Sequence, residues 1–419
     1  MATRPMIMQP LRVTAFTATC AAGRGKSALS AALRGRHSPL RRNDFTTGAL
    51  PTYIGRVDGL EAAALPTQWR AWDCRNNRLA WLAIQQDGFL QATQAAIARH
   101  GATRVAVLMG TSTSSIGASE EAYARLSADG QFPTDLAHPQ VHSPHSLGAF
   151  VAQALGAHGP CVTVATACSS SAKVFAQAER LIRCGLVDAA VVGGVDSLCQ
   201  SVLHGFKALG LLSSQPCRPF DADRDGINLA EAGGFALLER ASSAVALTHP
   251  AQESAPEVYL IGHGESSDAH HMSAPHPQGL GARQAMLEAL ARAGLTPAQV
   301  DYLNLHGTAT PKNDEVEAAV VAELFPPSTR AGSTKGWTGH PLGSAGILEA
   351  VVSLLALQQG WNPGTLHCDQ PDPAAGEAFK RLLQREAMQA SIGVAMSNSF
   401  GFGGNNCSLV FARAIRRDA

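Results

Sequence analysis

The sequence predicts an α/β fold in which a mostly parallel sheet is covered by helices. Short β-branched and apolar runs alternate along the chain with alanine-rich stretches that have helical periodicity. Two of the runs, residues 104–109 and 300–305, end in nearly the same turn, GTST in one case and HGTAT in the other. A proline-containing break at 249–256 separates them. This echo indicates a duplicated β/α unit, and sites in such sheets gather at the strand ends.

Composition limits the classes of function that the chain can serve. Of its 419 residues, 45% are hydrophobic and only 16% are charged, which is typical of a compact globular protein. The 33 Lys and Arg residues equal the 33 Asp and Glu residues, so no sequence-wide basic field exists for nucleic acid or an anionic membrane. Any electrostatic docking must therefore use a local patch.

The cysteines predict a reducing compartment. Nine are scattered along the chain, and no pair has C-x-x-C spacing, which argues against a disulfide scaffold or a zinc ribbon. Polar and proline residues interrupt the N-terminal apolar residues, and no apolar run reaches the length of a membrane span. We expect a cytoplasmic protein. We expect no metal site at His270, His271 and His276, because prolines flank them and their spacing is not helical.

The periodicity predicts individual elements. Strands are expected at 11–19, 104–109, 162–167, 189–194, 235–239, 300–305, 392–396 and 408–412, and helices at 23–33, 77–100, 281–294 and 344–359. Residues 36–65 are rich in Gly, Pro, Arg and Thr without periodicity, which predicts an extended surface segment.

Cys168 is placed by this pattern at a strand-to-helix turn, in the stretch VTVATACSSSAKVF. Free backbone N–H groups and the positive end of a helix dipole should lower the pKa of its thiol and are able to hold an oxyanion. A free cysteine is equally often a small buried apolar residue. Other segments must decide between these interpretations.

Further strand ends carry candidate partners for such a nucleophile. The block at His306 and the block from Lys335 to His340 offer a charge partner and hydrogen-bond donors, as a cysteine nucleophile requires. The glycine-rich loop 401–404 lets a backbone approach a ligand closely. The alternatives are core histidines and a plain glycine turn.

Six segments in sequence order resemble the β-ketoacyl-acyl-carrier-protein synthases of fatty acid and polyketide assembly. They are TACSSSAK around Cys168, CRPFDADRDG at 217–226, SDAHHMSAPHP at 267–277, HGTATPKND from His306, KGWTGHPLGSAG from Lys335 and SNSFGFGGNN from Ser397. The resemblance implies the thiolase-like fold, with two similar halves, 1–253 and 254–419, packed as a layered αβαβα core. It also implies a homodimer, or a heterodimer with a related ketosynthase or a chain-length-factor subunit.

The resemblance also implies roles for individual residues. Cys168 matches the nucleophile, and His306 and His340 match the two active-site histidines. Phe402 matches the gating residue whose N–H forms the oxyanion hole with that of Cys168. The remaining implied roles are catalytic support by Lys335 and Glu317; substrate binding by Thr308, Thr310, Thr113, Phe206, Gly401 and Gly403; and docking of an acidic carrier protein by Arg70, Arg75, Arg78, Arg125 and Lys207. The docking residues are also open to the interpretation of ordinary surface charge.

The implied reaction is a decarboxylative Claisen condensation. An acyl group held on Cys168 reacts with malonyl-acyl-carrier protein, and the phosphopantetheine arm of the carrier is the only prosthetic group implied. Glu349, Asn304 and Asn398 match positions around a buried monovalent ion in some relatives, or they satisfy backbone groups. CRNNRLAW and CSSSAKVF look similar to ketosynthases of aryl-polyene clusters. Asn405 departs from the threonine that the family often has beside the gate.

Two other functions remain open at this point. One is a non-catalytic chain-length-factor-type partner, although such partners usually lack the nucleophile. The other is an acyltransferase that loads carriers without condensing them.

Overall fold

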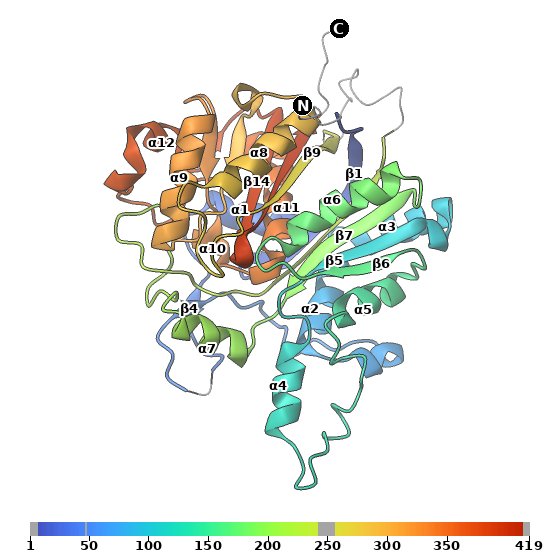
Figure 1. The fold of residues 1–419 in the computed structure, drawn as a ribbon. Helices are drawn as coiled ribbons and strands as arrows, with labels where there is room; N and C mark the ends of the chain where they lie inside the picture. Colours follow the sequence, from blue (N-terminus) through green and yellow to red (C-terminus); the bar gives the residue numbers. More distant parts are fainter. Residues whose placement is uncertain (1–6, 47, 242–255, 414–419) are drawn as a thin grey trace.

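The computed structural model describes residues 7–46, 48–241 and 256–413. Within these residues, ten strands follow one another in the order β11-β10-β14-β15-β9-β1-β8-β7-β5-β6, and the short β2 pairs with β1 (Figure 1). The predicted boundary between residues 253 and 254 lies outside the described residues.

The strands divide into two groups of five, which meet only where the start of β1 pairs with β9. The first group comprises β1 (Leu11–Cys20), β8 (Ala232–Arg240), β7 (Ala189–Asp196), β5 (Val105–Gly110) and β6 (Cys161–Val164). The second comprises β9 (Val258–Ser267), β15 (Asn405–Arg413), β14 (Val394–Gly401), β10 (Tyr302–Asn304) and β11 (Arg330–Gly332).

The two groups have the same topology. In each, the first three strands pair antiparallel and the last three pair parallel, so β5 corresponds to β10 and β6 to β11. The two GTxT turns therefore follow equivalent strands, and the predicted duplication is confirmed. The prediction of a mostly parallel sheet is wrong, because β1, β8, β9 and β15 pair only antiparallel with their neighbours.

Helices form three layers around and between the strand groups (Figure 1). The central layer packs against both groups and comprises α6 (Ser170–Arg183) and α11 (Ala345–Gln359). The outer helices are α2 (Arg75–Ile84), α3 (Phe89–His100) and α5 (Ser146–Leu155) on the first group, and α8 (Leu280–Ala293), α9 (Pro311–Leu324) and α12 (Gly376–Leu382) on the second. The layered α/β fold is confirmed.

The apolar segment Leu342–Gln359 includes α11 and is long and apolar enough to cross a membrane, but 89% of it is buried inside the protein. Every residue from Ala345 to Leu357 is buried. Its apolar character is therefore explained by its place between the two strand groups, where both faces of the helix contact the core.

Smaller elements complete the chain. They are β2 (Gly23–Arg24), α1 (Gly25–Arg34), β3 (Arg41–Arg42), β4 (Tyr53–Ile54), α4 (Ile116–Ala124), α7 (Gln200–Ala208), α10 (Lys335–Thr338), β12 (Trp361–Asn362) and β13 (Met388–Gln389).

Two predicted elements differ from the structure. The single helix expected at 77–100 is two helices, because Asp87 and Gly88 have left-handed φ angles of 55° and 71° and end α2 before α3 begins. The strand expected at 162–167 ends at Val164, and it is half-buried because β6 is the last strand of the sheet.

Candidate active site

Cys168 occupies a strained turn between β6 and α6. The preceding residue, Ala167, has a φ of +53°, and Thr166 and Cys168 form an isolated bridge across it. The turn is stabilised by the hydroxyl of Ser170, which donates to the Ala167 carbonyl at 2.6 Å. A positive φ at a residue with a side chain is uncommon and is found most often at functional sites. The predicted strand-to-helix position of Cys168 is confirmed.

His306 and His340 reach Cys168 from the second strand group. His306 follows β10, and His340 follows α10, which comes directly after β11 in the chain. The Cys168 sulfur and one ring nitrogen of each histidine all lie within 4.8 Å of one another. The two rings meet edge to face with centroids 5.5 Å apart. Residues far apart in sequence thus converge because the duplicated topology places their strand ends together.

A cavity of about 270 Å³ opens onto these three residues. Of the predicted substrate-binding residues, Phe206, Thr308, Thr310 and Gly401 line it, as do Phe402 and Lys312. Thr113 and Gly403 are not among its lining residues. The Thr113 hydroxyl donates instead to Asp196 at 2.7 Å, and the Gly403 N–H donates to the Met272 carbonyl at 2.7 Å.

The pKa of Cys168 differs from the sequence expectation. Burial raises the pKa of the thiol to about 11, although the Lys335 ammonium and a backbone hydrogen bond from Phe402 act to lower it. The expected lowering by the start of the helix is therefore wrong for the resting protein, because the thiol is 5% exposed and its charged form would lose most of its hydration. Formation of the thiolate then requires a nearby proton acceptor.

The two histidines are held in the neutral form. Burial is the main reason that the pKa values of His306 and His340 lie well below the usual value, and the Lys335 charge lowers both further. His340 Nδ1 accepts the backbone N–H of Leu342 at 3.2 Å. Because a neutral imidazole carries one proton, this contact leaves the proton of His340 on Nε2, as a hydrogen-bond donor.

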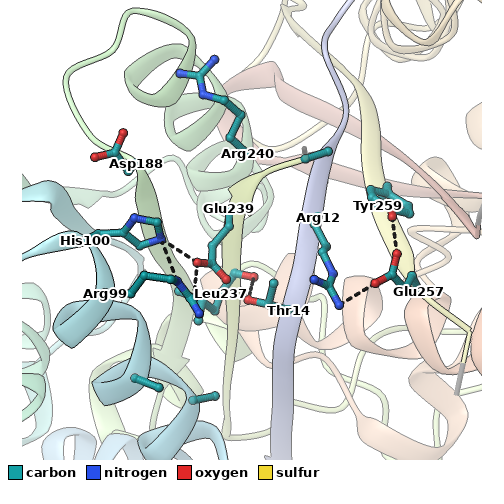
Figure 2. A pocket seen from close by; sticks show the side chains of 13 residues that line it. Arg12, Thr14, Arg99, His100, Asp188, Leu237, Glu239, Arg240, Glu257 and Tyr259 are labelled. Atoms are coloured by element: carbon teal, nitrogen blue, oxygen red, sulfur yellow. Dashed lines mark hydrogen bonds and ion pairs between the residues drawn. The ribbon is translucent and has the colours of Figure 1, made fainter. Parts of the chain in front are cut away.

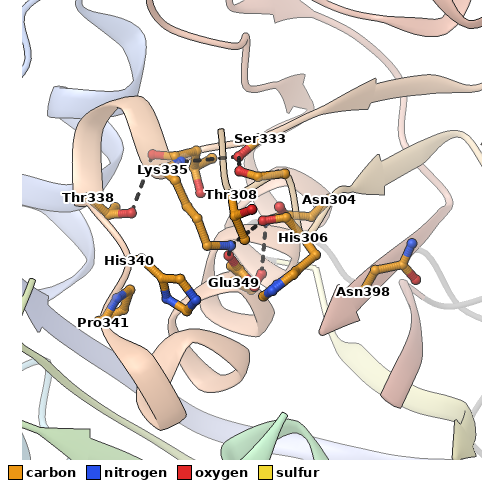
Figure 3. A network of polar contacts seen from close by, with 12 residues as sticks. Asn304, His306, Thr308, Ser333, Lys335, Thr338, His340, Pro341, Glu349 and Asn398 are labelled. Atoms are coloured by element: carbon orange, nitrogen blue, oxygen red, sulfur yellow. Dashed lines mark hydrogen bonds and ion pairs between the residues drawn. The ribbon is translucent and has the colours of Figure 1, made fainter. Parts of the chain in front are cut away.

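Lys335 and Glu349 form a buried ion pair beneath the histidines (Figure 3). The Lys335 ammonium also donates to the His306 carbonyl. Both side chains are at most 3% exposed, and burial raises the pKa of Glu349 to about 7 against the opposing effect of Lys335. The lysine thus fixes the His306 backbone and supplies the positive charge that acts on both rings.

Glu317 holds the His306 turn from the other side. Its two carboxylate oxygens accept the backbone N–H groups of His306 and Gly307, each at 2.8 Å. The neighbouring Asp314 accepts the Thr308 N–H at 3.0 Å. Burial raises the pKa of Glu317 to about 7. Both carboxylates are on α9, so this helix sets the position of the whole HGTAT turn.

The Phe402 loop lies directly against the nucleophile. A Cβ atom on Gly401 would lie 2.8 Å from the Thr166 carbonyl and 3.2 Å from the Cys168 nitrogen, so only glycine permits this approach. The Phe402 ring stacks on Phe206 with centroids 5.6 Å apart. The backbone N–H groups of Cys168 and Phe402 consequently face the same small volume beside the sulfur.

Two aspartates near the site were not predicted. Asp196, at the end of β7, accepts Thr111, Ser112 and Thr113 donors and the Ser344 N–H at 2.8 Å, so it joins the GTST turn to the segment after His340. Asp268 accepts the His276 N–H at 2.9 Å and the Asn406 amide at 2.8 Å. A carboxylate directly after an apolar strand was the available signal for Asp196.

The predicted docking arginines are engaged elsewhere. Arg75 pairs with Glu231, Arg78 with Asp73, and Arg125 with Asp135, at 2.7, 2.6 and 2.9 Å. Arg70, Arg75 and Arg78 line a separate groove of about 1370 Å³ whose walls also carry several carboxylates. Lys207, by contrast, follows Phe206 on α7, beside the mouth of the Cys168 cavity.

A further cavity of about 620 Å³ lies at the opposite end of β7 and β8 (Figure 2). Its charged groups are paired with one another: Arg99 and His100 contact Glu239, and Arg12 contacts Glu257. This cavity is remote from Cys168, because the parallel strands β5, β6 and β7 all end at the other edge of the sheet.

Family models cover most of the chain. The N-terminal domain model of the β-ketoacyl synthases matches residues 11–244, and the C-terminal domain model matches residues 259–369. The chain belongs to the β-ketoacyl synthase family. The solved complex of a ketosynthase (ApeO) with its chain length factor (ApeC) from Xenorhabdus doucetiae contains a chain 37% identical to this one, with a TM-score of 0.86 over 97% of this chain and 98% of that chain.

Other members of the family are similar at lower coverage or identity. A β-ketoacyl synthase from Burkholderia phymatum is 27% identical, with a TM-score of 0.82 over 98% of this chain and all of its own. The 3-oxoacyl-[acyl-carrier-protein] synthase 2 of Rhizobium meliloti is 41% identical over 67% of this chain, and the mitochondrial enzyme of Arabidopsis thaliana is 39% identical over 62%. The aligned part spans 64% and 58% of these two relatives.

Proposed function

We propose that this β-ketoacyl synthase family member catalyses the decarboxylative condensation of an acyl chain with a malonyl group on an acyl carrier protein. The observation that carries the proposal is the convergence of the Cys168 sulfur and the His306 and His340 rings within 4.8 Å at the end of one cavity. A chain-length partner needs no such convergence, so we do not favour that function.

The first step is acyl transfer to the enzyme. The Cys168 thiol gives its proton to a neutral imidazole, and the sulfur attacks the thioester carbonyl of the acyl-carrier protein. The carbonyl oxygen becomes an oxyanion, which the N–H groups of Cys168 and Phe402 bind. The carbon–sulfur bond to pantetheine then breaks, and the departing pantetheine sulfur takes up the proton. The acyl group remains on Cys168.

The second step forms the new carbon–carbon bond. The malonyl thioester loses its carboxylate as carbon dioxide, and the electron pair of the broken bond becomes an enolate. His340, with its proton on Nε2, donates a hydrogen bond to the enolate oxygen, and His306 binds beside it. The enolate carbon attacks the acyl-Cys168 carbonyl, and the Cys168 sulfur leaves and regains a proton.

The pantetheine arm would occupy the cavity between these groups and the surface. The hydroxyls of Thr308 and Thr310 lie 2.8 Å apart on its wall and are placed to bind the amides of the arm. The side chain of Lys312 lines the same cavity and is 76% exposed, and Lys207 is exposed close by. We propose these two lysines, rather than the paired arginines, as the main cationic contacts for an acidic carrier.

A buried monovalent cation also fits the chain. Asn304 Oδ1 and Glu349 Oε2 are buried without a hydrogen-bond partner among the described residues, and amide and carboxylate oxygens are suitable ligands for such ions. A cation bound there would stabilise the charged form of Glu349. Asn398, the third predicted residue, accepts the Ser408 hydroxyl at 2.8 Å, which supports the alternative of a structural role for it.

We further propose a cytoplasmic dimer with a second copy or with a related subunit, and an unsaturated acyl substrate. The partner proposal is supported by the similarity to a ketosynthase solved with its chain length factor. The polarity of the GTST turn does not support the substrate proposal, because Asp196 takes up the hydroxyls of Thr111 and Thr113. That proposal rests on resemblance to aryl-polyene ketosynthases.

Two measurements test the function. Incubation with an acyl-carrier protein should add one acyl mass to the protein, and Cys168→Ala should abolish the addition. Malonyl-carrier protein should then release carbon dioxide. Acyl addition without carbon dioxide release would instead indicate a carrier acyltransferase. A panel of saturated and polyenoyl carriers, compared by single-turnover rate, tests the preference for unsaturation.

A further inference from the structure

Lys173 and Asn405 connect the helix of the nucleophile to the loop that covers it. Lys173 lies five residues after Cys168, in the first turns of α6, and its ammonium donates to the Asn405 side-chain carbonyl at 3.3 Å. Asn405 is the first residue of β15 and pairs with Gly401, the last residue of β14. These paired residues form the base of the hairpin whose turn contains Phe402.

The Asn405 amide packs against that turn. Its nitrogen lies 3.5 Å from the Phe402 carbonyl, and a Cβ atom on Gly403 would be 3.2 Å from the same nitrogen. Two backbone hydrogen bonds hold the other side of the turn, from the Gly403 N–H to Met272 and from the Asp268 N–H to the Gly404 carbonyl. Asn405 is therefore the side chain that joins the turn to α6.

The chemistry of the pair suits a fixed contact. An ammonium group bound to an amide oxygen makes a charge-assisted hydrogen bond, which is stronger than a neutral one, and both side chains are partly shielded from water. The contact does not act by tuning the thiol, because Lys335 is the cation that lowers the pKa of Cys168. A positional role remains.

We infer that Lys173 and Asn405 are a positioning pair that sets the distance between the two oxyanion donors, the N–H groups of Cys168 and Phe402. One donor belongs to the turn at the start of α6, and the other to the hairpin turn that Asn405 supports. This inference rests on the proposed function, because the donors matter only if a tetrahedral oxyanion forms beside Cys168.

Single-turnover acylation of Cys168 by an acyl-carrier protein, followed by intact-protein mass spectrometry, tests the pair. Lys173→Met and Asn405→Ala should each slow acylation by about tenfold, and the double variant should be no slower than either, because each change breaks the same contact. Asn405→Asp keeps an oxygen for the lysine and should stay within about threefold of the wild type. Lys380→Met, on the surface helix α12, is the matched control.

Alkylation of Cys168 by iodoacetamide separates positioning from a general disturbance. Alkylation forms no oxyanion, so its rate in Lys173→Met should stay within about twofold of the wild type. The KM for the acyl carrier should also be unchanged. The inference is overturned if both single variants acylate like the wild type, or if alkylation slows as much as acylation. A wild-type protein that is alkylated but never acylated would overturn the proposed function and this inference with it.

Discussion

His340 Nδ1 accepts the backbone N–H of Leu342 at 3.2 Å, and this contact decides which ring nitrogen faces the chemistry. Leu342 itself has a φ of +52°, so the backbone is held in an uncommon conformation where the contact is made. His340 is consequently presented to the cavity as a neutral Nε2–H donor. A neutral donor is suited to an enolate, because it stabilises developing charge without protonating the carbon nucleophile.

Replacing His340 by Ala should separate the two halves of the reaction. We expect carbon dioxide release from malonyl-carrier protein to fall by about 100-fold or more, because a buried donor to the enolate oxygen is lost. Acylation of Cys168 should fall far less, since its oxyanion is bound by backbone N–H groups. Equal losses in the two assays would contradict the assigned role.

Replacing Lys335 by Met should strongly destabilise the fold. Glu349 would lose its counter-charge in a fully buried position, and we expect the free energy of unfolding in urea to fall by about 3 kcal/mol or more. The double variant Lys335→Met with Glu349→Gln removes both charges and should recover most of the loss. If the double variant were as unstable as the single one, the pair would not be the source of the effect.

Glu317 predicts a pH dependence of stability. Because burial raises its pKa to about 7, its protonated form favours the folded state, and that contribution is present below pH 4.5 and disappears as the pH rises through 7. Relative to Glu317→Gln, the wild type should therefore lose up to about 3 kcal/mol of unfolding free energy between pH 4.5 and 7.5. Chemical denaturation across this range measures the difference. A constant difference would show that the pKa of Glu317 is not raised.

The thiol of Cys168 should titrate late in the resting protein. With its pKa raised to about 11, the rate of alkylation by iodoacetamide should rise about tenfold per pH unit from pH 7 to 10, as measured on the Cys168 peptide. Lys335→Met should lower the rate at each pH, because the lysine charge favours the thiolate. A plateau below pH 8 would indicate a thiolate–imidazolium pair instead.

Most of the site could be predicted because its chemistry sits at strand ends in short, distinctive segments. Cys168 and His306 each follow a strand, and the duplicated topology alone brings the ends of β6 and β10 together. The pKa of Cys168 was predicted in the wrong direction, because burial depends on distant segments such as the Phe402 loop. The role of Asp196 was missed for the same reason: its partners, Thr113 and Ser344, are far from it in sequence and meet only in the fold.

The central claim is that one sulfur carries the acyl chain while two imidazoles generate the nucleophile that removes it. The most direct test mixes the protein with an acyl-carrier protein and a malonyl-carrier protein and reads the carrier-bound product by mass. The account predicts a β-ketoacyl chain two carbons longer than the starting acyl group, formed by the wild type and absent with Cys168→Ala. Formation of that product by Cys168→Ala at the wild-type rate would contradict it.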